Sequence, residues 1–168
     1  MLKDNFMQTL NEMEEVTKLF KLEPFEIYII GGGACILGEY TTRATLDIDF
    51  IDLSYPSKYG KVFALLRDYD MLEYKSTLIS PNYKKRAIKL DGFSYIDVYI
   101  LSKEDIVVSK IIRLADKDIE DINEIIPKCN KVLLNSIIEE VIKREDLYES
   151  KKTEFIKKVE VFKEKFDV

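Results

Sequence analysis

The feature that most constrains this chain is a run of three glycines, Gly31-Gly32-Gly33, directly after a short apolar segment. That segment, Phe25–Ile30, is rich in β-branched and aromatic residues, which predicts a strand. The glycines end the strand, and residues 34–37 open a short helix. Because glycine has no side chain, such a junction lets the backbone approach an anion closely and point its N–H groups at phosphate.

A pair of aspartates follows in a second predicted strand, over residues 46–53. Apolar residues alternate there with Asp47 and Asp49, so both aspartates point to one face of the strand. From the rise of a strand they lie about 6.6 Å apart, and together they can share Mg²⁺, which prefers oxygen ligands and substrate phosphates. Asp97 interrupts a further alternating strand, 93–101. Three carboxylates converge if that strand lies beside the strand of Asp47 and Asp49.

The remaining patterns predict an α+β fold. The first part is completed by predicted helices over 3–21 and 57–71 and by predicted strands over 73–79 and 86–90. After Leu101 helical periodicity dominates, beginning with a capping pattern at Ser102 and Asp105. Helices are expected near 103–115, 118–126, 130–144 and 150–166. We therefore expect a small mixed sheet with flanking helices in residues 1–101, followed by a helical region, 102–168, packed on it.

Composition excludes several kinds of chemistry. The 168 residues include no histidine, which removes histidine triads and histidine zinc sites. Cys35 and Cys129 are the only cysteines, too few for a zinc site or a disulfide framework, and both are expected to act as small buried hydrophobic residues. The net charge of −5 carries no nucleic-acid signature. Catalysis must use carboxylates, lysine, tyrosine, cysteine or a bound metal.

No segment predicts secretion or a membrane span. The first residues lack the apolar run of a signal peptide, and the most apolar stretch, 27–37, contains three glycines. That stretch is far shorter than the ~20 residues that a spanning helix needs. We therefore expect a cytoplasmic protein without a membrane partner.

In combination, these motifs resemble a known family. The order Gly31-Gly32, Arg43-x-Thr45-x-Asp47-x-Asp49 and then Asp97 is similar to the nucleotidyltransferase superfamily that shares the DNA polymerase β catalytic core. Within it, the chain resembles AbiEii and related short bacterial nucleotidyltransferases, many of them linked to toxin–antitoxin or phage-defence systems. The resemblance covers about residues 25–126 and includes a downstream charged segment with Lys110, Asp118 and, as a weaker match, Asp121.

The resemblance implies a role for each matching residue. The metal-binding carboxylates, which would hold Mg²⁺ or Mn²⁺, are Asp47, Asp49 and Asp97. Lys110 joins them as a catalytic residue that neutralises charge or anchors phosphate. The residues that bind the nucleotide are Gly31, Gly32, Arg43, Thr45 and Asp118. One departure is Leu46, because relatives often have a polar or basic residue before the first aspartate.

The implied activity is a metal-dependent transfer of a nucleoside monophosphate from an NTP to an acceptor hydroxyl, with release of pyrophosphate. The acceptor could be tRNA, a protein or a small molecule, and the role could be that of a toxin or phage-defence component with an antitoxin protein as partner. An alternative is a catalytically inactive regulator or partner-binding protein with the same fold. A more distant alternative is a sugar transferase that uses Asp-x-Asp to hold a metal.

Each motif also has a structural interpretation. The glycines could form an ordinary tight turn, Asp97 could be exposed or salt-bridged, and Arg43 could hold its loop through carbonyl groups. Lys110 could be a solvated helix residue, while Asp118 and Asp121 could pair with Lys117 and Arg113 on a charged face. The basic run 83–86 could steer an anionic acceptor, but it also fits a solvated turn.

Overall fold

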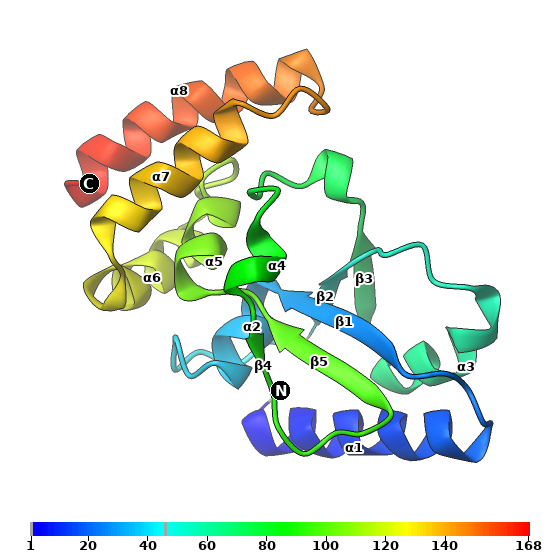
Figure 1. Ribbon diagram of the computed structural model, residues 1–168. Coiled ribbons are helices and arrows are strands. Elements are labelled where there is room, and N and C mark those ends of the chain that lie inside the picture. The colour runs from blue at the N-terminus through cyan, green and yellow to red at the C-terminus, as the bar shows by residue number, and fades with distance from the viewer. Residues whose placement is uncertain (1, 46) are drawn as a thin grey trace. The chain divides into compact units, whose positions relative to one another are not determined.

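The computed structural model describes residues 2–45 and 47–168, and the chain divides into two compact units (Figure 1). The first unit comprises Met1–Leu72 and Ala87–Leu101, and the second comprises Glu73–Arg86 and Ser102–Val168. The change of periodicity predicts one boundary, after residue 101. In the structure the chain also crosses between the units after residues 72 and 86, because the segment 73–86 belongs to the second unit.

A five-stranded mixed sheet forms the centre of the first unit, in the order β3-β2-β1-β5-β4. Its strands are β1 (Phe25–Ile30), β2 (Ile48–Ile51), β3 (Tyr69–Leu72), β4 (Ile88–Lys89) and β5 (Ile96–Ile100). β1 is parallel to β5 and antiparallel to β2, β3 is parallel to β2, and β4 is antiparallel to β5. The predicted small mixed sheet is confirmed. Leu46, the predicted start of the second strand, lies outside the described residues.

Alternation of side chains decides which face of the sheet forms the core. In β5, Ile96, Val98 and Ile100 are buried, whereas Asp97 and Tyr99 are only half-buried, as the period of two requires. The pairing registers place further buried residues of neighbouring strands on the same face: Phe25, Ile27, Ile29, Ile48 and Phe50. The opposite face of β1, β2 and β5 therefore carries the aspartates.

The first unit contains three α-helices in its described residues. They are α1 (Lys3–Leu19), α2 (Gly31–Leu37) and α3 (Gly60–Phe63), with 3-10 turns η1 (Ser57–Tyr59) and η2 (Ala64–Leu66) on either side of α3. The helix predicted over 57–71 is wrong in its last part, because helical structure ends at Leu66 and β3 begins at Tyr69. Arg67 between them has φ +60°, a left-handed conformation that ends the helix.

The second unit is helical, as predicted. Its elements are η3 (Tyr74–Ser76), α4 (Tyr83–Arg86), α5 (Lys103–Lys110), α6 (Asp116–Ile125), η4 (Ile126–Lys128), α7 (Lys131–Ile142) and α8 (Glu149–Phe166). The predicted capping at the start of α5 is confirmed, since the Ser102 hydroxyl accepts a hydrogen bond from the Asp105 N–H at 3.1 Å. The strand predicted over 73–79 is wrong: this segment is a 3-10 turn and irregular chain. The strand predicted over 86–90 is reduced to β4.

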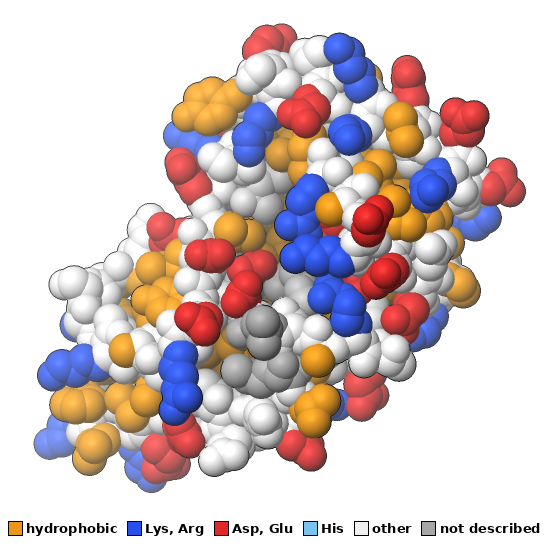
Figure 2. Space-filling model, turned by 180° about the vertical axis from the view of Figure 1, so that it is seen from behind, with side chains coloured by type: hydrophobic (Ala, Val, Ile, Leu, Met, Phe, Trp, Pro, Cys, Tyr) orange, Lys and Arg blue, Asp and Glu red, His pale blue; other side chains and the backbone are white. Residues whose placement is uncertain are grey.

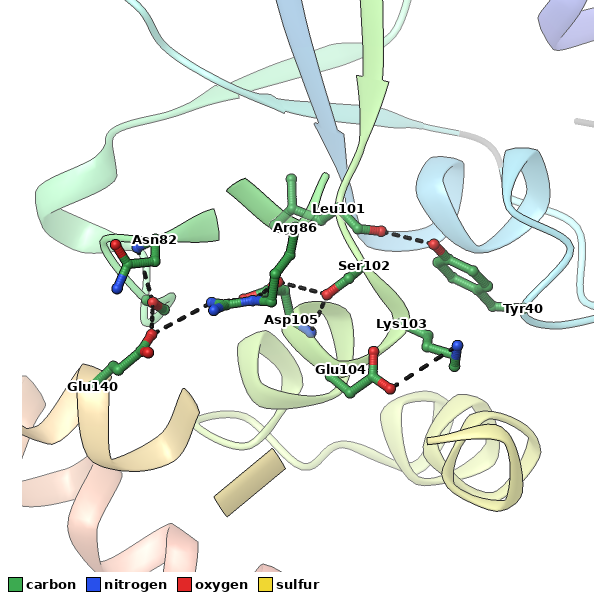
Figure 3. A network of polar contacts seen from close by, with 10 residues as sticks. Tyr40, Asn82, Arg86, Leu101, Ser102, Lys103, Glu104, Asp105 and Glu140 are labelled. Atoms are coloured by element: carbon green, nitrogen blue, oxygen red, sulfur yellow. Dashed lines mark hydrogen bonds and ion pairs between the residues drawn. The ribbon is translucent and has the colours of Figure 1, made fainter. Parts of the chain in front are cut away.

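An ion pair inside the second unit explains why the segment 73–86 belongs to it. Arg86 donates two hydrogen bonds to the Asp105 carboxylate, at 2.8 and 2.9 Å, and Asp105 is fully buried (Figure 3). The pair therefore joins α4 to α5. The basic run 83–86 forms α4 and not a turn: Lys84 and Lys85 are exposed, whereas Tyr83 is buried and Arg86 is ion-paired.

The surface shows mixed charge. Figure 2 shows acidic and basic side chains side by side over one face of the molecule. In the parts of the chain that the structure describes, no helix is both long and apolar enough to cross a membrane.

Neither of the two cysteines, both of which the structure describes, is in a disulfide. Cys35 is buried in α2, as expected, whereas Cys129 is half-buried. Burial raises the pKa of the Cys129 thiol to about 12, so this thiol stays protonated and unreactive at neutral pH.

Candidate functional site

The glycine turn begins where β1 ends. Gly31 has φ +67°, a left-handed conformation that glycine adopts at little cost. A Cβ atom built on Gly31 would lie 2.9 Å from Oδ2 of Asp49. The backbone of the turn therefore lies directly against the carboxylate of Asp49, and both the conformation and the space disfavour a side chain at Gly31.

The loop after α2 returns to the same turn. A Cβ atom on Gly32 would lie 2.7 Å from Oγ1 of Thr45, so Thr45 covers the second glycine. The Thr45 hydroxyl also donates to the Asp47 carbonyl at 3.4 Å. Gly33 has a different surrounding, since its Cβ would meet the side chains of Ile29 and Phe6 at 3.2 Å. Gly31 and Gly32 therefore face the polar residues, and Gly33 serves packing.

Asp47 lies just before β2, and Asp49 is the second residue of that strand. Asp47 is exposed and Asp49 is half-buried, and the register pairs Asp49 with Ile30, the last residue of β1. The structure therefore brings together the predicted residues Gly31, Gly32, Thr45, Asp47 and Asp49 at the end of β1.

A third aspartate lies beside this pair, and the sequence analysis missed it. Asp70 on β3 is the register partner of Asp49 on β2. Asp70 and Asp47 also line one small cavity of about 250 Å³, together with Arg67, Asp68 and Tyr69. The signal was hidden because periodicity assigned residue 70 to a helix, where it has no strand partner.

The expected convergence of Asp97 with the other two carboxylates is not found. β5 does not lie beside β2, because β1 lies between them, and Asp97 pairs with Glu26 near the start of β1. Asp49 pairs with Ile30, four residues further along β1, which is about 13 Å in a strand.

The surroundings of Asp97 agree with the salt-bridge alternative. Its Oδ1 lies 3.2 Å from Nζ of Lys89 on β4, and both side chains are partly exposed. The stacked rings of Tyr28 and Tyr99, with centroids 4.7 Å apart, lie on the same face between Asp97 and Asp49. The register and these rings thus separate Asp97 from the glycine turn.

Arg43 lies in the loop between α2 and β2. It is half-buried, and its Nη1 donates to the carbonyl of Ala44 at 3.5 Å, a long hydrogen bond. It also lines a cavity of about 320 Å³ with Thr41, Thr42 and Ile36, among others. The carbonyl contact agrees with a structural role of Arg43 in its loop, and the cavity agrees with the nucleotide-binding role that the resemblance implies.

Lys110, Asp118 and Asp121 belong to the second unit and form a buried ion cluster there. Nζ of Lys110 lies 3.0 Å from Oδ2 of Asp121 and 3.6 Å from Oδ1 of Asp118. Arg113 donates two hydrogen bonds of 2.6 Å to Asp118, and the Ala115 N–H donates a third at 3.0 Å. Lys110 is not a solvated helix residue: its side chain is only 7% exposed.

The partners of Asp118 determine its protonation. Burial alone raises the pKa of this carboxyl. The hydrogen bonds from Arg113 and the charge of Lys110 outweigh burial and hold the pKa below its ordinary value. Asp118 is therefore a fixed anion that joins α5 to α6. That Lys110 and Asp118 face a nucleotide stays a prediction.

The donor set at the glycine turn suits a hard cation completed by substrate. Among the described residues, no group of three carboxylate, histidine or cysteine side chains is arranged to hold a metal ion. Mg²⁺ is usually bound by one or two carboxylates together with water and substrate phosphates, so Asp47 and Asp49 suffice in number and type. The residues present therefore fit an ion that arrives with a phosphorylated substrate.

The mixed sheet, the glycine turn at the end of β1 and the Asp-x-Asp sequence against that turn define the nucleotidyltransferase class. The chain belongs to the family described as "Nucleotidyltransferase of unknown function (DUF6036)", which matches residues 4–167. The comparison with curated proteins gave no match, and neither did the comparison with solved structures.

Proposed function

We propose that this protein is a metal-dependent nucleotidyltransferase that moves a nucleoside monophosphate from an NTP to an acceptor hydroxyl. The observation that carries the proposal is the close approach of the Gly31 backbone to the Asp49 carboxylate, so close that a Cβ atom built on Gly31 would lie 2.9 Å from Oδ2. This contact supports a site in which backbone N–H groups for phosphate and a carboxylate for a cation serve the same triphosphate.

Asp47 and Asp49 would hold Mg²⁺ or Mn²⁺. The bound ion supplies charge stabilisation on the attacking and leaving oxygens of the displacement. The N–H groups of Gly31 and Gly32 bind the outer phosphates, and Thr45 holds the loop against the turn. Arg43, two residues before Thr45, is the nearest cation in sequence to compensate the phosphate charge.

The reaction is an in-line displacement at the α-phosphorus. The bond from the acceptor oxygen to the α-phosphorus forms as the bond to the bridging oxygen of the β-phosphate breaks. Pyrophosphate leaves with that electron pair, and the hydroxyl proton passes to water. Positioning and electrostatics carry most of such a transfer, which agrees with a chain that lacks histidine.

Binding of MgATP, measured by calorimetry and thermal unfolding, tests the proposal. Triphosphate and carboxylates repel each other without a cation, so Mg²⁺ and ATP should stabilise the fold together and much less separately. At a hundredfold excess over the dissociation constant the gain is about 2.7 kcal/mol. Transfer from α-labelled NTPs to tRNA, to the protein and to small hydroxyl compounds then identifies the acceptor. Equal stabilisation by ATP with and without Mg²⁺ contradicts the site.

A second function, that of a non-catalytic regulator that keeps nucleotide binding, is favoured by one observation. Asp97 does not join Asp47 and Asp49, and no third carboxylate completes a metal-holding group among the described residues. Tight MgATP binding with no transfer to any acceptor would support the regulator.

The toxin role that the resemblance implies is tested by expression in bacteria. If the protein inhibits growth through nucleotidyl transfer, the wild-type chain arrests growth and Asp49→Asn does not. Equal growth arrest by both chains separates toxicity from transfer.

A further inference from the structure

A groove in the first unit is not used by the proposed reaction. It runs along α1 and is closed on its other side by Leu65 of η2, with a volume of about 700 Å³. Its half-buried lining residues, which form the floor, are apolar, and its exposed lining residues, which form the rim, are three carboxylates and two amides. The residues that matter here are Met7, Val16 and Leu65 on the floor and Asp4, Glu12 and Glu15 on the rim.

The groove is separate from the face with which α1 packs into the core. Phe6, Leu10, Met13 and Thr17 form that core face, and all four are fully buried. The rim residues Asp4, Glu12 and Glu15 are exposed instead. None of these three carboxylates forms an ion pair within the part of the chain that the structure describes. The rim therefore presents uncompensated negative charge around an apolar floor.

We propose that this groove binds an amphipathic helix of a partner protein whose apolar stripe is flanked by lysine or arginine. The inference goes beyond the nucleotidyltransferase function and does not depend on it. An apolar stripe matches the floor, and cationic side chains match the three rim carboxylates. Nucleic acid is disfavoured, because its phosphates would meet the acidic rim.

The dimensions agree with a helix as the occupant. From Asp4 to Val16 the groove follows twelve residue-to-residue steps of α1, which is about 18 Å of helix. A partner helix of about three turns covers that length in the helix-in-groove mode of recognition. Met7 on the floor has a flexible, polarisable side chain that adapts to different apolar partners.

The probe is a fluorescent helical peptide of about 14 residues, with leucines at spacings of three and four and lysines on either side. A second peptide has glutamate in place of every lysine. We expect the lysine peptide to bind the full chain, measured by fluorescence anisotropy, and the glutamate peptide not to bind. The triple variant Asp4→Asn, Glu12→Gln, Glu15→Gln should weaken binding about tenfold.

A matched control distinguishes an effect of the groove carboxylates on binding from an effect of the net charge of the chain. The triple variant Glu154→Gln, Glu160→Gln, Glu164→Gln removes three exposed carboxylates from α8 in the other unit, so its net charge equals that of the groove variant. We expect the control to bind the lysine peptide within about twofold of wild type. Equal weakening by the two triple variants overturns the proposal, since net charge alone then explains binding.

A third variant tests the floor. Leu65→Lys places a cation and a longer side chain at the apolar wall, so it should abolish binding of the lysine peptide while the fold is kept, as judged by circular dichroism. Full binding by a folded Leu65→Lys overturns the proposal. Analytical ultracentrifugation of the chain alone tests whether a second copy of the chain occupies the groove. Self-association that Leu65→Lys abolishes would assign the groove to a second copy and would overturn the proposal of a partner helix.

Discussion

Substitution of Gly31 by alanine gives the most direct test of the geometry at the glycine turn. Gly31 has φ +67°, and a non-glycine residue in the left-handed region costs roughly 1–2 kcal/mol. The new Cβ would also lie 2.9 Å from Oδ2 of Asp49, closer than side-chain contacts allow. The Asp49 carboxylate must therefore move by a few tenths of an ångström.

Gly92 supplies a matched control in the same unit. Its φ is +96°, also in the left-handed region, but a Cβ atom there would meet nothing within 4 Å. Gly92→Ala therefore carries the backbone cost without the contact to Asp49. Both variants should unfold about 1–2 kcal/mol more easily than wild type, with Gly31→Ala the less stable of the two. For a chain of this size that loss lowers Tm by about 2–8 °C.

The site readout is the affinity for MgATP. The new methyl group would displace the Asp49 carboxylate and also occupy the space through which a phosphate approaches the backbone of the turn, so Gly31→Ala should weaken MgATP binding at least ~10-fold. Gly92→Ala should bind as wild type does. The measurements are chemical unfolding for stability and calorimetry for MgATP. Wild-type affinity in a folded Gly31→Ala, or equal loss of affinity in both variants, would refute the reasoning.

Three further predictions concern single aspartates. Asp49→Asn should reduce single-turnover transfer at least ~100-fold. Asp97→Asn should leave transfer within about threefold of wild type, because Asp97 is paired with Lys89 of β4 and is level with the start of β1, away from the glycine turn. A collapse of transfer in Asp97→Asn would return Asp97 to the site. Asp105→Ala should cost about 3–5 kcal/mol in urea unfolding, because it leaves a guanidinium without its main partner; a loss below about 1 kcal/mol contradicts a structural ion pair. The depressed pKa of Asp118 adds stability that is present above the pKa of this carboxyl in the unfolded chain and is lost as the pH falls below about 4. Asp118→Asn should therefore flatten the decline of the unfolding free energy in acid. An unchanged slope contradicts the assignment.

The local order of elements could be predicted from the sequence. Phe25–Ile30 was predicted as a strand and has those bounds in the structure, and the helix predicted over 3–21 and the capping of α5 also agree. The resemblance also implied that the glycine turn and Asp49 serve one site, and the structure places them against each other. A strand, a short helix and a returning strand are close in sequence, so few arrangements are open to them.

The predicted helix and strand boundaries that were wrong lie where a segment fits both a helical and an extended pattern. Residues 69–72 continue the apolar spacing of a helix, but in the structure they extend the sheet beside β2. Pairing with a neighbouring strand supplied hydrogen bonds that local periodicity cannot reveal. Asp70 was therefore missed, although it is the register partner of Asp49.

From the sequence by itself came the chemistry that is available and most of the helices and strands, and the resemblance implied that the two glycines and the Asp-x-Asp pair serve one site. The order of the strands became known only from the fold: β1 lies between β2 and β5, which sets Asp97 about 13 Å along β1 from the level of Asp49. The fold also shows that Lys110 is buried between Asp118 and Asp121. The physical reason is that periodicity fixes the face on which a side chain lies, whereas strand order, register and ion pairing depend on contacts between distant segments.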